Sequence, residues 1–220
     1  MKKILCLLLA IWVIFSATGC SNSIPTSKQA ATKTNYYSSI KEQDNNLVFD
    51  LELNDFVSNY RKTAFMIKYE RDVEFDTTDT MLEVSDFEKI GTGTSWFTPI
   101  ESERWSVLLS DNNNLVVGKD NNGIASIMLM SPSKTEILLS QFICVIQAVT
   151  QEFTDDNYID EEAFDIADEL IEKMGTATNA AAVYRKGIVF YFRPLENPDV
   201  WVFGAEAVTE EQYKKITNKE

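Results

Sequence analysis

Apolar and polar side chains alternate at residues 47–53, a pattern typical of a half-buried β-strand. Leu47, Phe49, Leu51 and Leu53 would face inward, and the residues between them would face outward. The first element of the folded part is therefore expected to be a short strand.

A helix is expected next, followed by a second strand. Asn54 or Asp55 can cap the helix, because short polar side chains accept hydrogen bonds from free backbone N–H groups. Its apolar positions are near helical spacing: Phe56, Val57, Tyr60 and Ala64. Renewed alternation predicts another strand at residues 65–75. Residues 76–99 are mostly polar and are expected to be rich in loops.

The clearest β pattern lies in the middle of the chain. Three apolar runs, at residues 105–109, 115–117 and 124–130, are separated by segments rich in Asp, Asn and Gly. These residue types supply the positive φ angles that tight turns require. The pattern predicts an antiparallel three-stranded meander.

Two helices and a second group of strands are predicted after the meander. Ser133 and Glu136 fit a capping box for a helix through residue 153, and an amphipathic helix follows at residues 160–174. Thr209 and Gln212 fit another capping box, for a short terminal helix. The expected strands are residues 182–184, 188–192 and 200–203.

This order predicts an α+β fold, with antiparallel sheet or sheets packed against a helix pair in two layers. Residues 46–220 would form a single domain, or two sub-units that meet near residue 131. In its order of elements the domain resembles small secreted bacterial lipoprotein domains of unknown function. That resemblance implies no functional residue.

The N-terminus has the parts of an export signal. Lys2 and Lys3 precede an unbroken apolar run at residues 4–15, and small residues then lead to Gly19 and Cys20. This ending resembles the lipobox of bacterial lipoproteins. The resemblance implies that residues 1–19 are a signal peptide, and that Cys20 is lipidated and becomes the new N-terminus.

The same resemblance implies a location. Two acyl chains are enough for stable anchoring, so the protein would be held at the cell membrane, on its extracytoplasmic face, through lipid on Cys20. Residues 20–45 have few large apolar side chains and are expected to form a flexible tether. The apolar run at residues 4–15 is too short to span a bilayer, so no transmembrane helix is expected in the mature chain.

Charge and residue types narrow the possible chemistry. A formal net charge of −14 argues against nucleic acid as a partner, because such binding depends on Lys and Arg. The chain has no histidine, which excludes Ser–His–Asp and Cys–His catalysis. With the signal removed and Cys20 lipidated, Cys144 would be the one remaining thiol, and it is expected to be a buried apolar residue. No metal site and no cofactor are expected.

The acidic residues are concentrated between residues 152 and 172, a segment without Lys or Arg. Glu161, Asp165, Asp168 and Glu172 lie at i, i+4, i+7 and i+11, so they would share one helix face. One interpretation is a docking face for a basic protein, a cationic peptide or divalent cations. The alternative is a solvated face without a partner.

These observations favour a non-enzymatic binding or interaction module. An enzyme that uses carboxylates alone, for example on cell-envelope glycans, is the first alternative, and a deep cleft lined by acids in opposed environments would favour it. A small-ligand carrier is the second, and an enclosed apolar cavity of some hundreds of Å³ would favour it. A shallow surface with exposed apolar residues would favour the interaction module.

Overall fold

The computed structural model describes residues 36–43, 46–98, 100–121, 123–133, 135–150, 159, 161–176, 180–195 and 200–217. They belong to one compact unit. The predicted signal peptide, Cys20 and most of the predicted tether lie outside the described residues, as does the predicted end of the helix at residue 153.

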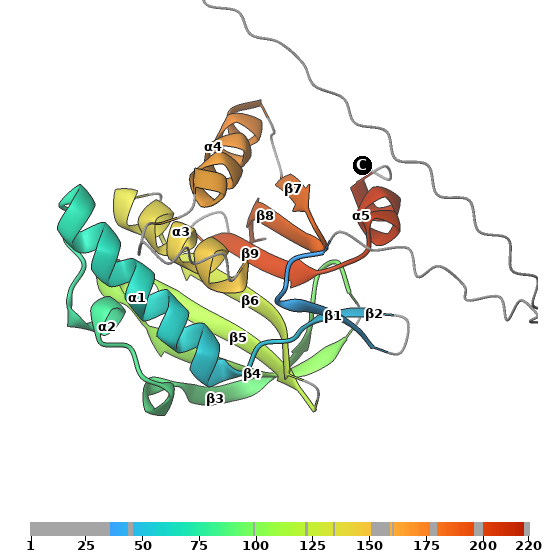
Figure 1. The fold of residues 1–220 in the computed structure, drawn as a ribbon, viewed down its shortest axis with the longest axis horizontal. Coiled ribbons are helices and arrows are strands. Elements are labelled where there is room, and N and C mark those ends of the chain that lie inside the picture. Colours follow the sequence, from blue (N-terminus) through green and yellow to red (C-terminus); the bar gives the residue numbers. More distant parts are fainter. Residues whose placement is uncertain are drawn as a thin grey trace, which may run out of the picture. The chain divides into compact units, whose positions relative to one another are not determined.

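An antiparallel seven-stranded sheet is the main element of the fold (Figure 1). Its strand order is β3-β4-β5-β6-β9-β8-β7. In chain order the strands are β3 (Glu88–Thr94), β4 (Glu101–Leu108), β5 (Asn114–Asp120), β6 (Gly123–Ser131), β7 (Ala181–Arg185), β8 (Ile188–Pro194) and β9 (Trp201–Ala207). A separate hairpin pairs β1 (Ile40–Gln43) with β2 (Asn46–Phe49).

Helices pack against this sheet, so the predicted α+β class with an antiparallel sheet is confirmed. The helices are α1 (Leu53–Arg71), α2 (Thr77–Thr80), α3 (Glu136–Thr150), α4 (Glu161–Thr176) and α5 (Glu210–Thr217). Two 3₁₀ turns are η1 (Val84–Asp86) and η2 (Ser110–Asn112). The long helices α1 and α3 lie side by side over one face of the sheet (Figure 1).

The main core lies between these helices and the sheet. Alternate strand residues such as Leu115, Ile127 and Phe190 contribute to it, together with Phe56 of α1 and Phe142 of α3. The opposite face of the sheet carries a smaller apolar cluster. There Val189, Tyr191 and Val202 pack with Phe97 and with apolar side chains of α5.

The predicted meander is present as β4, β5 and β6, with β3 added at its edge. The turn residues adopt the positive φ angles expected of them: 60° at Asp111, 57° at Asn112 and 130° at Gly123. The strands predicted at residues 182–184, 188–192 and 200–203 are present as β7, β8 and β9. In these segments local turn chemistry and tertiary structure agree.

The strand predicted at residues 65–75 is wrong, because α1 continues through Arg71. The buried residues Tyr60, Ala64 and Ile67 are spaced for a helix, whereas Phe65 and Tyr69 are 53% and 69% exposed. The alternation arose because two large apolar residues lie on the solvent side of the helix. The loop-rich segment predicted at residues 76–99 contains α2, η1 and β3.

The domain begins earlier than residue 46. Strand β1 lies inside the range predicted for the tether, and Tyr37 is buried. The Ser39 hydroxyl donates to the carbonyl of Val149 at the end of α3, which joins this segment to the core. The pairing of β6 with β9 continues the sheet across residue 131, so the described residues are not divided into two sub-units there.

The cap predicted for α1 is wrong, because the helix begins at Leu53, directly after Glu52, and Asn54 and Asp55 lie inside it.

The other two predicted helix caps differ in outcome. The N–H of Leu138 donates to Thr135 Oγ1 at 3.2 Å, so Thr135 and not Ser133 caps α3. The capping box of α5 is confirmed. The N–H of Thr209 donates to Gln212 Oε1 at 2.8 Å, and the N–H of Gln212 donates to Thr209 Oγ1 at 3.2 Å.

Candidate functional site: the α2 face

A buried carboxylate holds the short helix α2 in place. Asp79 has no exposed surface. Its Oδ1 accepts hydrogen bonds from Tyr60 Oη at 2.8 Å and from Gln141 Nε2 at 3.0 Å. Its Oδ2 accepts from the backbone N–H of Ser110 at 3.0 Å and from the Ser110 hydroxyl. These bonds connect α2 to α1, α3 and η2.

Further polar groups extend this network. Gln141 Oε1 accepts from Asn113 Nδ2 at 2.7 Å, and the hydroxyl of Ser110 accepts from the N–H of Asp76 at 2.9 Å. All four donors to Asp79 are uncharged groups, and they satisfy a side chain whose burial without hydrogen bonds would be costly. Burial, and to a smaller extent the nearby Asp79, raises the pKa of Tyr60 well above its ordinary value. The phenol therefore stays protonated and acts as a donor.

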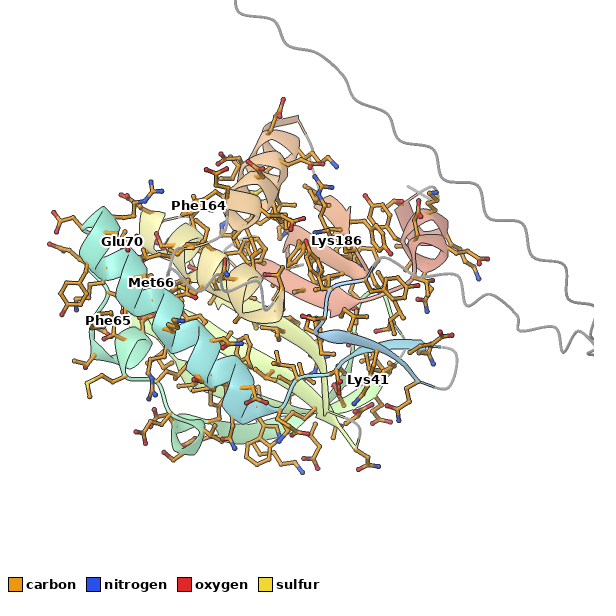
Figure 2. The ribbon with its side chains drawn as sticks, viewed as in Figure 1. Lys41, Phe65, Met66, Glu70, Phe164 and Lys186 are labelled. Atoms are coloured by element: carbon orange, nitrogen blue, oxygen red, sulfur yellow. The ribbon has the colours of Figure 1, made fainter. Side chains whose placement is uncertain are left out.

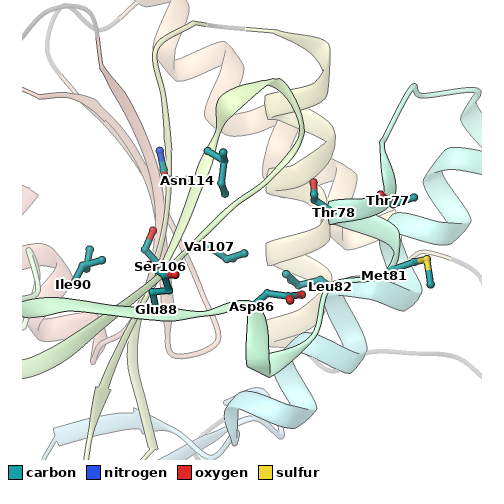
Figure 3. A pocket seen from close by; sticks show the side chains of 11 residues that line it. Thr77, Thr78, Met81, Leu82, Asp86, Glu88, Ile90, Ser106, Val107 and Asn114 are labelled. Atoms are coloured by element: carbon teal, nitrogen blue, oxygen red, sulfur yellow. The ribbon is translucent and has the colours of Figure 1, made fainter.

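Two open clefts lie on either side of α2. The first, of about 470 Å³, is lined by α1 residues including Arg61, Lys62 and Phe65, and by Thr80 of α2. The second is about 710 Å³ and lies between the α2–η1 segment and strands β3, β4 and β5 (Figure 3). Met81 lines this second cleft on one side, and Ile90 and Leu108 line it on the strand side.

Exposed apolar side chains gather around these clefts. Among the described residues, six large hydrophobic side chains are exposed. Five of them lie in or beside the clefts: Phe65, Tyr69, Met81, Ile90 and Leu108. Phe65 projects from α1 on the side that carries α2 (Figure 2), and its ring lies 4.4 Å from that of Tyr69.

Charged residues border the same surface. Arg61 and Lys62 precede Phe65 by four and three positions on α1, so all three share one helix face. Asp86 and Glu88 line the second cleft, which has no Lys or Arg among its described lining residues. We call this surface the α2 face, defined by the following residues: Arg61, Lys62, Phe65, Tyr69, Met81, Asp86, Glu88, Ile90 and Leu108.

A second buried carboxylate lies on the opposite side of the sheet. Glu206 of β9 accepts the backbone N–H groups of Trp96 and Phe97, each at 2.8 Å, and that of Thr98 at 3.2 Å. Burial raises the pKa of Glu206, and the N–H donors and the bonded Tyr191 hydroxyl partly offset this rise. Glu206 fastens the segment before β4 to the sheet, with no exposed surface of its own.

Arg104 lies near Glu206, and its guanidinium group is also held by hydrogen bonds. Its Nη1 donates to Ser126 Oγ at 3.0 Å, and its Nη2 donates to the carbonyl of Thr94 at 2.6 Å. Gly118 leaves room for this group, because a Cβ atom there would lie 2.6 Å from Ser126 Oγ. The two buried carboxylates, Asp79 and Glu206, thus occupy separate polar networks and do not share a cleft.

The four acidic residues predicted as a docking face are exposed on α4: Glu161, Asp165, Asp168 and Glu172. Their neighbours Glu162 and Glu169 differ, because these turn toward the β7–β8 turn. Glu162 pairs with Lys186 at 3.1 Å, and Glu169 pairs with Arg185. Among the described acids of this segment, two therefore hold α4 against the β7–β8 turn and four face solvent.

Cys144 is buried in α3, as expected, and it is a free thiol. Burial, and to a smaller extent the nearby Asp79, raises the pKa of the Cys144 thiol well above its ordinary value, so this thiol is a poor nucleophile. In the described part of the chain, no group of three or more Cys, Asp or Glu side chains could hold a metal ion.

The sequence indicated the acidic face of α4 but not the α2 face. Asp79 lies in a run of polar residues, and nothing local distinguishes it from an exposed acid. The one signal of the α2 face in the sequence is the pair of large apolar residues Phe65 and Tyr69, whose alternation with polar residues also fits a strand.

In the described residues, no helix is both long enough and apolar enough to cross a membrane. Comparison with protein-family models, with curated proteins and with solved structures found no match.

Proposed function

We propose that this chain is a membrane-anchored, extracytoplasmic interaction module that binds another polypeptide through the α2 face. The observation that carries the proposal is the concentration of exposed apolar side chains. Five of the six large exposed hydrophobic side chains among the described residues belong to this one face. Contiguous exposed apolar surface on a folded domain is typical of a protein interface.

The way α2 is held supports this function. A helix of four residues has little stability of its own, because the first helical turn is costly to form. The Asp79 network supplies the missing stability through bonds to α1, α3 and η2. The face is thus preorganised, which lowers the entropy cost of binding.

The placement of the acids favours binding over carboxylate catalysis. Acid–base catalysis by two carboxylates needs them in one cleft with environments that separate their pKa values. Asp79 and Glu206 are buried in different networks, and the acids of the larger cleft, Asp86 and Glu88, are both exposed. The open clefts, with Met81, Ile90 and Leu108 more than half exposed, also fit a protein surface better than a small-ligand pocket.

The membrane-anchored part of the proposal rests on the N-terminal sequence, where the segment ending at Cys20 resembles a lipobox. The acidic face of α4 is a second proposed surface, for a basic protein or peptide. Its support is that ion pairs occupy Glu162 and Glu169, whereas Glu161, Asp165, Asp168 and Glu172 face solvent.

Photocrosslinking in native membranes tests the proposed interface. A photoreactive amino acid replaces Met81 in the full chain, and Lys215, an exposed residue of α5, serves as the control position. We expect a discrete polypeptide adduct from position 81 and none from position 215. Adding Phe65→Gln should reduce the adduct from position 81 without changing the unfolding midpoint. No discrete adduct at position 81, or equal adducts at both positions, would contradict the proposal.

A further inference from the structure

The two edges of the seven-stranded sheet differ. At the β7 edge, side chains of two helices bind the strand, because the carbonyl of Ala182 accepts from Lys173 Nζ of α4 at 3.1 Å and from Tyr213 Oη of α5 at 3.3 Å. Strand β3 forms the other edge (Figure 1), and six of its seven residues are exposed. All the hydrogen bonds that β3 makes with other described residues run to β4. Within the described part of the chain, the outer side of its backbone therefore keeps unpaired N–H and C=O groups.

The side chains of β3 do little to block this edge. A lysine that projects from an edge strand keeps other strands away. Lys89 is the one basic residue of β3, and its Nζ is paired with Glu103 of β4 at 2.6 Å. A β-bulge between Lys89 and Gly91 disturbs the start of the strand, whereas residues 91–94 continue in regular register with β4 and carry no charge.

The edge is continuous with the α2 face. Glu88 and Ile90 belong to β3 and also line the second cleft of that face. A polypeptide that covers Met81 and Ile90 therefore reaches the unpaired backbone of β3 without leaving this surface.

The surroundings of β3 are acidic at both ends of the strand. The second cleft, at its start, contains Asp86 and Glu88 and has no Lys or Arg among its described lining residues. A hollow of about 390 Å³ near its end is lined by Thr92, by three acids and by one lysine: Glu101, Glu103, Asp120 and Lys119. Arg61 of the α2 face lines neither of them. This charge favours a basic segment, and it disfavours a second copy of β3, which would bring further acids against these.

We propose that the polypeptide bound by the α2 face adds an extended segment that carries Lys or Arg to the edge of β3, as a further strand of the sheet. In strand addition the main-chain hydrogen bonds supply affinity, and the side chains of the added segment supply specificity. The inference rests on the proposed function, since it names the partner segment of that interface and the way it binds.

Hydrogen–deuterium exchange tests the main-chain pairing. The full chain is compared in native membranes and as dilute, detergent-dispersed protein. Successive strand residues direct their N–H groups to opposite sides, so alternate amides of β3 point outward. These outward amides should exchange at least about tenfold more slowly in membranes, whereas the amides of β7 serve as the control and should exchange equally in both preparations.

Charge reversals test the basic character of the segment. Glu88→Lys and Glu101→Lys should each lower the yield of the photoadduct at position 81 by about fivefold, because each replaces an attraction by a repulsion. Glu211→Lys on α5 is the matched control, with the same change in net charge, and should have no effect. All three glutamates are exposed, so the unfolding midpoint should not change.

The outcomes separate this inference from the proposed function. Slower exchange in β3 together with lower yields in both variants supports the added basic strand. A polypeptide adduct at position 81 with unchanged exchange in β3 would overturn strand addition and leave the proposed interface. Protection of β3 without an effect of either reversal, or an adduct of twice the chain mass, would overturn the basic segment as the occupant. No adduct and no protection would overturn both proposals.

Discussion

The hydroxyl of Tyr60 on α1 donates a 2.8 Å hydrogen bond to Asp79 of α2, and both side chains are fully buried. The bond fixes the short helix to the long one and so determines where the exposed side chains beside α2 lie. The position of the α2 face therefore depends on a carboxylate that never reaches the surface.

Replacing Asp79 by Asn should destabilise the fold by about 3 kcal/mol. The amide nitrogen that this change introduces cannot accept the hydrogen bonds that Ser110 donates to one carboxylate oxygen, and buried donors without an acceptor are costly. Tyr60→Phe removes one donor and should cost about 1 kcal/mol. Urea unfolding followed by tryptophan fluorescence measures both values. Equal, negligible losses would show that the network does not support α2.

Glu206 should make stability depend on pH in a defined direction. Its pKa in the folded state is raised above the ordinary value of 4.5. A group with a raised folded pKa contributes stability that is present below the unfolded pKa and is lost as pH rises through the folded pKa. The free energy of unfolding of the wild type, relative to Glu206→Gln, should therefore increase as the pH falls from neutrality toward 4.5. A relative stability that falls over this range would contradict the assignment.

Cys144 should be unreactive in the folded protein. Its thiol is buried and its pKa is raised, so little thiolate is present and reagents cannot reach it. In a Cys6→Ser, Cys20→Ser chain, labelling with a maleimide should be slow without denaturant and complete in concentrated urea. Rapid labelling of the folded chain would mean that α3 opens or that the thiol is accessible.

Neutralising the solvent side of α4 should not destabilise the domain. Asp165, Asp168 and Glu172 repel one another, so the triple change to Asn, Asn and Gln should leave stability unchanged or raise it by a few tenths of a kcal/mol. Glu169→Gln is the matched control and should cost about 1 kcal/mol or less, because it loses its ion pairs with Arg185 and Lys173. Thermal melting compares them. A clear loss in the triple variant would show that these acids make structural contacts.

Cys20→Ser should release the domain from membranes without unfolding it. The prediction follows from the lipobox-like sequence and from the position of the first described residues of the domain, sixteen residues after Cys20. Fractionation of cells followed by immunoblotting shows where the variant is found, and circular dichroism checks its fold. Retention in the membrane fraction after a high-salt wash would contradict lipid anchoring.

The sequence predicted elements whose determinants are local. The strands from β4 to β6 are predictable because turns rich in Asp and Asn separate them. The start of α5 is predictable because Thr209 and Gln212 form a complete capping box. The order of these elements was enough to predict the α+β class.

Features determined by distant contacts could not be predicted in the same way. Strand β3 is largely exposed at the sheet edge, so its residues show no apolar alternation. The partners of Asp79 on α1, η2 and α3 lie 19, 31 and 62 residues away in sequence. Phe65 and Tyr69 are exposed, although large apolar side chains are usually buried. Such exceptions are expected at functional surfaces.

The central proposal is that a bound polypeptide covers the α2 face in the native membrane. The rate at which a thiol reagent labels the cysteine of a Met81→Cys variant tests this directly. The rate is measured in intact membranes and in dilute, detergent-dispersed protein, with Lys215→Cys as the control and the parent chain as background. We predict slower labelling in membranes at position 81 and equal rates at position 215. Equal rates at position 81 in both preparations would show that the face is uncovered and would contradict the account.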